Sequence, residues 1–531
     1  MREVALSLFV FFLVKCVNSI FSPPTREHFK SCLSTNHSNS IFENPNILTK
    51  HTSDSQTYTS FSESLSKNSS FLSLNFTSLK PILIAKPKSE PEIKKLILCS
   101  KKLGLQVRTL SGGHDYEGLS YLSQSPFIII DLVNLRSIKI NLTEETAWIK
   151  SGATLGELYY KIAKTSKIHG FPGGVCPSVG VGGLFSGGGY GIIMRKHGLA
   201  SDNVVDARLI DAKGKIHDRK SMGEDLFWAL RGGGAASFGV VLSWKVKLVR
   251  VPEKVTCFTS QHAMGPNRSK LVHRWQYIGP HLDDDLFIRV FINNNQQQGS
   301  QKRVRTTFQG MFLGGIEKLI PLMNEKFPEL GLRSQDCKEM SWIEANLFFI
   351  GKFGQPLEIM LDRDQRYENL YFKAKSDYVQ KPLQENVFEE IFKRFLEEDA
   401  PSMSFDPLGG KINEVLEEES PYPHREGNLY SVQYTVRWKV NEMEEMKKHV
   451  RWIRLLYDYM TPYVSGSPRG AYLNYRDLDL GMNKGIKMSF EDAKKWGEMY
   501  FKGNFKRLGL VKGKIDPNNF FKSEQSIPPL F

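Results

Sequence analysis

Two separated glycine-rich stretches of the chain each contain one nucleophilic side chain. Residues 108–115 carry His114, and residues 173–180 carry Cys176. Because glycine has no Cβ, backbone N–H groups in such loops can approach a ligand closely, which suits a phosphate-bearing cofactor. Imidazole and thiol side chains can both bond covalently to such a cofactor. The two stretches therefore predict one cofactor held by two anchors.

The spacing of the glycines excludes the common nucleotide-binding motifs. A dinucleotide fingerprint needs G-x-G-x-x-G. The triplets that start at Gly180, Gly187, Gly189 and Gly232 have Phe185, Ile192, Met194 and Ser237 in place of the last glycine. The chain also has no P-loop, H-E-x-x-H or C-x-x-C motif, so no metal site is expected. The cofactor must sit on loops of another fold.

Apolar runs and turn residues predict the elements that position these loops. A strand at residues 106–110 runs directly into the His114 loop, whereas the tract 170–191 is too rich in glycine for a regular element. The other elements predicted before Pro252 are strands at 81–85, 127–132, 138–140, 147–151, 204–211, 215–218 and 240–249, and helices at 91–103, 154–165 and 225–230.

Beyond Pro252 the pattern predicts an α+β domain whose sheet carries helices on one face. Its strands lie at 286–292 and 429–440, its helices lie at 316–326, 385–397 and 442–460, and a further helix-containing unit follows from Tyr472. Alternation along 429–440 places Ser431, Gln433, Thr435 and Arg437 on one face and apolar residues on the other. The polar face should meet either solvent or an active-site cavity.

The N-terminus predicts secretion. Residues 1–19 contain an apolar run that fits a signal peptide and is too short to span a membrane. Sequons for N-glycosylation occur at Asn36, Asn68, Asn75, Asn141 and Asn267. The net charge of +14 comes from scattered Lys and Arg, which argues against nucleic acid and suggests affinity for an extracellular polyanion such as acidic cell-wall polysaccharide.

Six cysteines are present, and Cys16 would leave with the signal peptide. The remaining odd number means that at least one thiol is unpaired or otherwise engaged. If Cys176 holds a cofactor, a bridge between Cys32 and Cys99 would attach the N-terminal segment to the first helix. Cys257 and Cys337 could pair or stay buried as small apolar residues.

Four tracts, 108–121, 170–199, 227–234 and 472–479, together resemble the plant berberine bridge enzyme-like family, whose members are FAD-linked oxidases of the vanillyl-alcohol oxidase superfamily. The resemblance implies an α+β fold, with a PCMH-type FAD-binding domain of two subdomains and a substrate domain built on an antiparallel sheet. The implied divisions are a signal peptide at 1–19, a leader at 20–75, the FAD-binding domain at 76–251, the substrate domain at 252–470 and a C-terminal segment at 471–531 that returns to the FAD-binding domain.

The resemblance also implies FAD attached twice, through His114 to carbon 8α and through Cys176 to carbon 6. The expected pyrophosphate cradle is Ser111, Gly112, Gly113 and Asp115, and the residues expected along the adenosine and the ring edges are Gly182, Gly183, Ser186, Gly187, Val240 and Val241. Val179 resembles the family's oxygen gatekeeper, where valine favours an oxidase over a dehydrogenase; it could also be a small packing residue.

On the substrate side, the resemblance implies that Tyr475 is the base, with Tyr190 as its partner and Gln433 in the catalytic group. Both tyrosines could instead be packing aromatics. Ser431, Arg289 and Arg437 are expected to face the substrate, and Ser431 replaces a Lys or Glu that many relatives carry.

The expected function is a secreted, monomeric flavoprotein oxidase of the apoplast, cell wall or vacuole. It would transfer a hydride from a sugar, phenylpropanoid alcohol, alkaloid or other specialised metabolite to flavin N5 and reduce O2 to H2O2. The Ser431 departure leaves open a non-redox cyclase of the Diels–Alder type on the same fold.

Overall fold

The computed structural model describes residues 26–34, 81–262, 267–295, 302–363, 371–439, 442–483 and 488–531. The predicted signal peptide, most of the leader and the sequons at Asn36, Asn68 and Asn75 lie outside these residues. Asn141 is exposed on β4, and the side chain of Asn267 is not described. Within the described ranges, no helix is long and apolar enough to cross a membrane.

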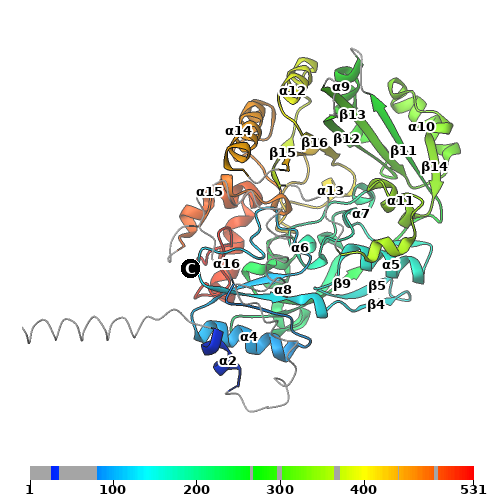
Figure 1. Cartoon of the computed structure of the whole chain (residues 1–531). Helices are drawn as coiled ribbons and strands as arrows, with labels where there is room; N and C mark the ends of the chain where they lie inside the picture. The colour runs from blue at the N-terminus through cyan, green and yellow to red at the C-terminus, as the bar shows by residue number, and fades with distance from the viewer. Residues whose placement is uncertain are drawn as a thin grey trace, which may run out of the picture.

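The first half of the chain forms two main sheets (Figure 1). The smaller is parallel, with strand order β1 (Leu83–Ala85), β3 (Phe127–Asp131) and β2 (Gln106–Leu110). The larger is antiparallel, with order β4 (Ile138–Asn141), β5 (Thr146–Lys150), β9 (Val240–Lys247), β7 (Val204–Ile210) and β8 (Ile216–His217). A two-stranded ladder joins β6 (His169–Gly170) to β10 (Val249–Arg250).

Helices cover these sheets and tie the N-terminal segment to them. α2 (Arg26–Ser34) packs on α4 (Glu90–Lys102), and the predicted disulfide joins Cys32 to Cys99. The other helices of this half are α5 (Leu155–Thr165), α6 (Val181–Ser186), α7 (Met194–His197) and α8 (Arg219–Leu230).

The second half is built on a seven-stranded antiparallel sheet. Its strand order is β14 (Cys337–Met340), β11 (Val255–His262), β13 (Arg303–Phe312), β12 (Leu286–Asn295), β16 (Pro401–Pro407), β17 (Tyr430–Trp438) and β15 (Tyr371–Val379). The longer helices of this half are α9 (Asn267–Ile278), α10 (Ile316–Lys326), α11 (Trp342–Phe349), α12 (Glu385–Glu397) and α14 (Met443–Met460). Figure 1 shows α9, α12 and α14 on the outer side of the sheet.

The predicted alternation of β17 accounts for this layering. Tyr430, Val432, Tyr434 and Val436 are completely buried, and Tyr434 meets Tyr457 of α14 edge to face. The opposite face points toward the first half of the chain, where Gln433 lines a cavity. After α14 the chain returns across that half and ends in α15 (Phe490–Phe501) and α16 (Asn504–Ile515), which packs on α8.

The α+β prediction is confirmed, but one local expectation was wrong and the predicted set of elements was incomplete. The glycine-dense tract contains the helix α6, because Val181 and Phe185 lie four positions apart and are completely buried on one face. The predicted helix at 225–230 lies in the second part of α8; a helical segment capped by Asp218 precedes it, and a break at Gly223, whose φ is 69°, separates the two. Strands β11, β13, β14, β15 and β16 were not predicted.

Candidate active site

A cavity of about 570 Å³ lies between the two glycine loops, β17 and the segment that follows Ala471. The structure therefore brings together most of the residues that the sequence singled out. Those on the cavity wall are Ser111, Gly112, Gly113, His114, Asp115, Cys176, Val179, Gly182, Gly183, Ser186, Gly187, Tyr190, Val241, Arg289, Gln433, Arg437 and Tyr475.

Val240 and Ser431 do not line this cavity. Successive strand residues point to opposite faces, so Val241 reaches the cavity while Val240 packs in the core beneath α4. Ser431 lies on the cavity side of β17 but is only 3% exposed, between Tyr378 and Asp406 of the neighbouring strands. The cavity wall on β17 is formed by Gln433, Thr435 and Arg437 instead.

The two glycine loops touch each other through their backbones. A Cβ on Gly112 would lie 2.2 Å from the nitrogen of Gly180, and a Cβ on Gly180 would lie 2.2 Å from the nitrogen of Gly112. No side chain fits at either position. Ser111 Oγ fixes the first loop by donating to the Ser151 carbonyl at 2.5 Å. Glycine is thus required here for loop-to-loop contact as well as for access to a ligand.

The candidate anchors His114 and Cys176 stand on this joined pair of loops. Cys176 is a free thiol whose Sγ lies 3.9 Å from Ser178 Oγ, and burial raises its pKa. The thiol therefore stays protonated at neutral pH. Cys257 and Cys337 are also free and buried, so of the two alternatives the structure shows unpaired cysteines.

Asp115 connects the His114 loop to the C-terminal segment. Its Oδ2 accepts a hydrogen bond from Arg476 Nε at 2.7 Å, and its Oδ1 accepts from the backbone N–H groups of Glu117 and Leu119 at 3.0 Å each. The carboxylate thus shapes the loop and fixes Arg476, the residue after Tyr475.

Tyr475 stacks on Tyr116, with ring centroids 5.3 Å apart. Gln433 Nε2 donates to the Tyr116 hydroxyl at 2.6 Å, so the two rings and the amide form one polar edge of the cavity. Burial raises the pKa of Tyr475 well above its usual range; Tyr116 and Asp406 act in the same direction and Arg289 opposes them. Tyr116 was missed by the sequence analysis, although it lies two positions after His114.

Tyr190 contacts Tyr475 only ring edge to ring face, with centroids 6.3 Å apart. Its hydroxyl is hydrogen-bonded to those of Tyr378 and Tyr422, at 2.8 Å each, and its ring stacks on Tyr472 at 4.1 Å. Tyr190 therefore packs against the base candidate while its hydroxyl points into a separate tyrosine cluster.

Arg289, one of the two arginines expected on the substrate wall, is paired. Arg289 Nε donates to Asp406 Oδ1 at 2.7 Å, and the Asp406 side chain is 2% exposed. The pair brings no net charge to the cavity, and the nearby aromatic rings of Phe291, Phe349 and Phe372 make much of the wall apolar.

Two buried lysines of β15 hold the loops of Tyr116 and Tyr475 together. Lys373 Nζ contacts Glu117 Oε1 at 2.5 Å and Asp477 Oδ1 at 2.7 Å. Lys375 Nζ contacts Asp477 Oδ2 at 2.5 Å and Asp479 Oδ2 at 3.1 Å. Glu117 follows Tyr116 directly, and Asp477 lies two residues after Tyr475. We call these five charged residues the lysine clasp.

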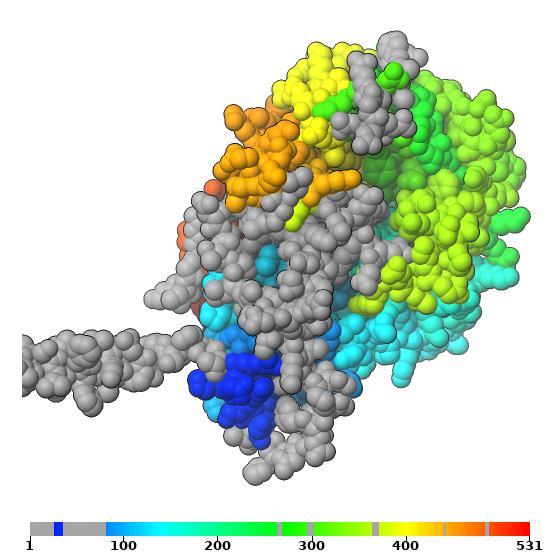
Figure 2. All heavy atoms as spheres, viewed as in Figure 1, coloured from blue at the N-terminus to red at the C-terminus, as the bar shows by residue number. Residues whose placement is uncertain are grey.

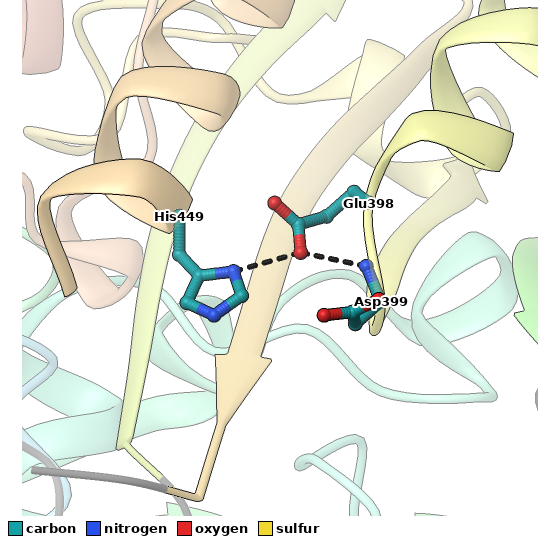
Figure 3. Close-up of side chains that lie close together, drawn as sticks. All are labelled: Glu398, Asp399 and His449. Carbon is teal, nitrogen blue, oxygen red and sulfur yellow. Dashed lines mark hydrogen bonds and ion pairs between the residues drawn. The ribbon is translucent and has the colours of Figure 1, made fainter. Parts of the chain in front are cut away.

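Another group of titratable side chains lies away from the cavity, between α12 and α14 (Figure 3). Glu398 Oε1 accepts from His449 Nδ1 at 2.7 Å and from the Asp399 backbone at 2.6 Å. Lys302 neutralises Asp399 at 2.8 Å. The hydrogen bond between Glu398 and His449 joins the end of α12 to α14.

Comparisons with known proteins cover the whole chain. The family described as FAD binding domain matches residues 81–219, and the family described as Berberine and berberine like matches residues 471–528. The chain is 75% identical to Berberine bridge enzyme-like 22 of Arabidopsis thaliana over 531 residues, 100% of both chains. It is 47% identical to tetrahydroberberine oxidase of Berberis wilsoniae over 509 residues, 95% of this chain and 94% of that one.

Among solved structures, the fold is similar to that of Phl p 4, a grass pollen allergen with glucose dehydrogenase activity. The TM-score is 0.86 at 40% identity, over 95% of this chain and 100% of that one. A Phl p 4 variant with one isoleucine replaced by valine is a glucose oxidase.

Proposed function

The chain belongs to the berberine bridge enzyme-like family of FAD-linked oxidases, and we propose that it is a secreted oxidase with bicovalently bound FAD. It is an FAD-dependent oxidoreductase with the α+β, PCMH-type fold predicted from the sequence. The finer proposal is that it oxidises a small molecule and reduces O2 to H2O2. The substrate is a sugar, phenylpropanoid alcohol, alkaloid or other specialised metabolite.

The observation that carries the proposal is the contact between Gly112 and Gly180, which brings the loops of His114 and Cys176 to one cavity. This geometry fits a cofactor that bonds to the protein at two positions, one to His114 and the other to Cys176. When bound, FAD supplies a hydride acceptor at N5 and passes the electrons to O2. Gly183 has no atom within 4 Å of the place where a Cβ would stand, so its backbone is open to the cavity.

Tyr475 is the proposed base. Oxidation of an alcohol carbon requires its hydroxyl proton to leave as the hydride leaves, and Tyr475 Oη would accept that proton. Stacking on Tyr116, which Gln433 holds by a hydrogen bond, fixes the ring. The raised pKa means that most of Tyr475 is protonated at neutral pH. We therefore expect kcat/KM to rise with pH through the neutral and mildly alkaline range.

Val179 supports the assignment as an oxidase. It lines the cavity three residues after Cys176, and valine is also the residue introduced in the Phl p 4 variant that is a glucose oxidase. A small side chain leaves room for O2 beside a bound ring.

The covalent bonds can be tested by acid precipitation of the purified protein. We expect the yellow colour to stay with the pellet in the wild type and in either single variant, His114→Ala or Cys176→Ala, and to move to the supernatant in the double variant. Cys257→Ala, a free thiol off the cavity wall, is the matched control. Release of flavin from the wild type contradicts bicovalent attachment.

The reaction can be tested by anaerobic bleaching of the flavin colour across sugars, alcohols and alkaloids, followed by peroxide measurement in air. With a bleaching substrate, Tyr475→Phe should slow turnover about 10²- to 10⁴-fold, whereas the exposed Tyr277→Phe should leave it unchanged. Bleaching without peroxide would identify a dehydrogenase. Product formation without bleaching or peroxide would identify the non-redox cyclase.

A further inference from the structure

Among the exposed lysines of helix α4 and the β7–β8 hairpin are Lys94, Lys101, Lys213 and Lys215, which we call the lysine surface. The two elements are in direct contact. Lys101 Nζ donates to the Ala212 carbonyl at 3.2 Å, and a Cβ on Gly214 would lie 3.0 Å from Lys94 Cγ. The four lysines therefore stand on two elements that touch each other.

Near this surface, the carboxylates of Glu90, Glu92 and Asp211 form no ion pair with its four lysines. Glu90 pairs with Arg208 at 2.8 Å, and Glu92 accepts from the Lys88 backbone at 2.7 Å. Asp211, within the hairpin, accepts from the backbone of Lys213 and Lys215 and contacts His217 at 2.9 Å. None of the four lysines forms an ion pair in the part of the chain that the structure describes, so the surface keeps its positive charge.

Local helix electrostatics explain only part of the cluster. Lys101 stands in the last turn of α4, where the helix dipole favours a cation. Lys94 lies in the middle of the helix, and Lys213 and Lys215 lie on the hairpin. Grouping like charges costs stability, and a polyanion offsets that cost.

We propose that the lysine surface binds an acidic polysaccharide, a flexible chain that carries one carboxylate on each of many sugar units. Flexible lysine side chains suit repeated carboxylates at variable spacing, because each ammonium is a mobile point charge. The inference concerns a site separate from the cavity and does not rest on the proposed oxidase activity.

The apolar groups within the surface favour a polysaccharide over a nucleic acid or a membrane. They are two exposed aliphatic side chains, Leu98 and Ile216. Single-stranded nucleic acid is gripped by aromatic platforms, and interfacial membrane binding uses large apolar or aromatic anchors. The exposed aromatic residues of the described chain, Tyr277, Phe353 and Phe531, belong to other segments.

The position of the surface leaves the cavity open. Figure 1 shows α4 at the end of the molecule opposite α9 and α12, and the space-filling view shows α2, which packs on α4, at the same end (Figure 2). None of the four lysines lines the cavity. A bound polymer would hold the protein without covering the candidate active site.

The test uses the full secreted protein and immobilised polygalacturonate as the probe. The variant K94Q/K101Q/K213Q/K215Q should bind roughly 10- to 100-fold more weakly at low salt and elute at lower salt. The matched control K270Q/K318Q/K352Q/K381Q removes the same charge from exposed lysines of the second half that form no ion pair among the described residues. It should weaken binding no more than about 3-fold.

Additional variants and polymers test the chemistry of the partner. The double variant K213Q/K215Q changes only the hairpin, and the logarithm of its binding constant should fall by about half as much as that of the fourfold glutamine variant of the lysine surface. A fourfold Lys→Arg variant should retain binding. A fully methyl-esterified polymer should bind poorly. The proposal is overturned if the two fourfold variants weaken equally, if the neutral polymer binds as tightly, or if anionic lipid vesicles or DNA depend on the four lysines while polygalacturonate does not.

Discussion

The lysine clasp and the lysine surface use the same side chain under opposite conditions. Lys373 and Lys375 are 1% and 2% exposed, and each contacts carboxylates at 2.5 Å. Lys94, Lys101, Lys213 and Lys215 are exposed and form no ion pair among the described residues. A charge compensated inside the protein fixes its neighbours, whereas a charge left uncompensated outside attracts a partner. Burial, rather than residue type, therefore separates the structural role from the binding role.

The electrostatics of the clasp depend on its acids. Burial by itself would lower the pKa of Lys373, but Asp477, Glu117 and Asp479 outweigh it and raise that pKa above its ordinary value. Lys373, Lys375 and Arg454 in turn hold the pKa of Asp479 below its usual range, against the effect of burial. The pKa shifts of Lys373 and Asp479 therefore come from the opposite charges beside them.

Removing Lys373 should have the largest effect. Lys373→Met leaves Glu117 and Asp477 buried with less compensation, which should lower the free energy of unfolding by about 3–5 kcal/mol. Chemical denaturation measures this directly. A loss below about 1 kcal/mol would mean that the clasp does not stabilise the fold.

Acidification should break the clasp next. Because the pKa values of Asp477 and Asp479 are lowered in the folded protein, their stabilisation is fully present above the unfolded pKa near 3.9 and is lost as the pH falls below it. We expect roughly 2 kcal/mol to disappear between about pH 5 and pH 2. Thermal unfolding across this range should show the loss, and the fourfold glutamine variant of the lysine surface should follow the same curve as the wild type.

A smaller effect is expected at the loop that the clasp positions. Tyr116→Phe removes the hydroxyl that accepts from Gln433 Nε2 and should lower kcat/KM roughly 10-fold, with stability changed by about 1 kcal/mol. Steady-state kinetics with a bleaching substrate test this. An equal loss in Phe372→Leu, which removes a neighbouring ring without a hydroxyl, would assign the effect to packing.

Removing the exposed lysines should have the smallest effect on folding. The fourfold glutamine variant should unfold within about 0.5 kcal/mol of the wild type, because these side chains are exposed and form no ion pair among the described residues. Denaturation of the two proteins side by side gives the answer. A loss as large as that of Lys373→Met would erase the contrast between the two regions.

Sequence pattern alone predicted the elements whose signals are local. The strand at Gln106–Leu110, the helix at Glu385–Glu397 and the two-faced β17 follow from apolar runs and periodicity. The strand β15 could not be predicted in this way, because the charged residues Lys373, Lys375 and Asp377 are typical of a solvent-exposed segment. Their partners at 117, 469, 477 and 479 are far away in the sequence, so no spacing rule can pair them.

In the candidate site, too, the placement of some residues could be predicted from the sequence and the placement of others could not. His114, Cys176 and Tyr475 lie in motifs with a family resemblance, and the structure brings all three to one cavity. The hydroxyl of Tyr190 is committed to Tyr378 and Tyr422, and Ser431 lies outside the cavity wall, because strand register and ring packing decide such details. Neither detail can be read from the residues next to Tyr190 or Ser431 in the sequence.

The clasp also sets an order of events during synthesis. Lys373 and Lys375 leave the ribosome about a hundred residues before Asp477 and Asp479, and Asp115 precedes its partner Arg476 by 361 positions. Until the chain has reached residue 479, Lys375 lacks its carboxylate partners, Lys373 has only Glu117, and the His114 loop lacks Arg476. A cofactor that requires the finished cavity can therefore be captured only after nearly the whole chain has been translated.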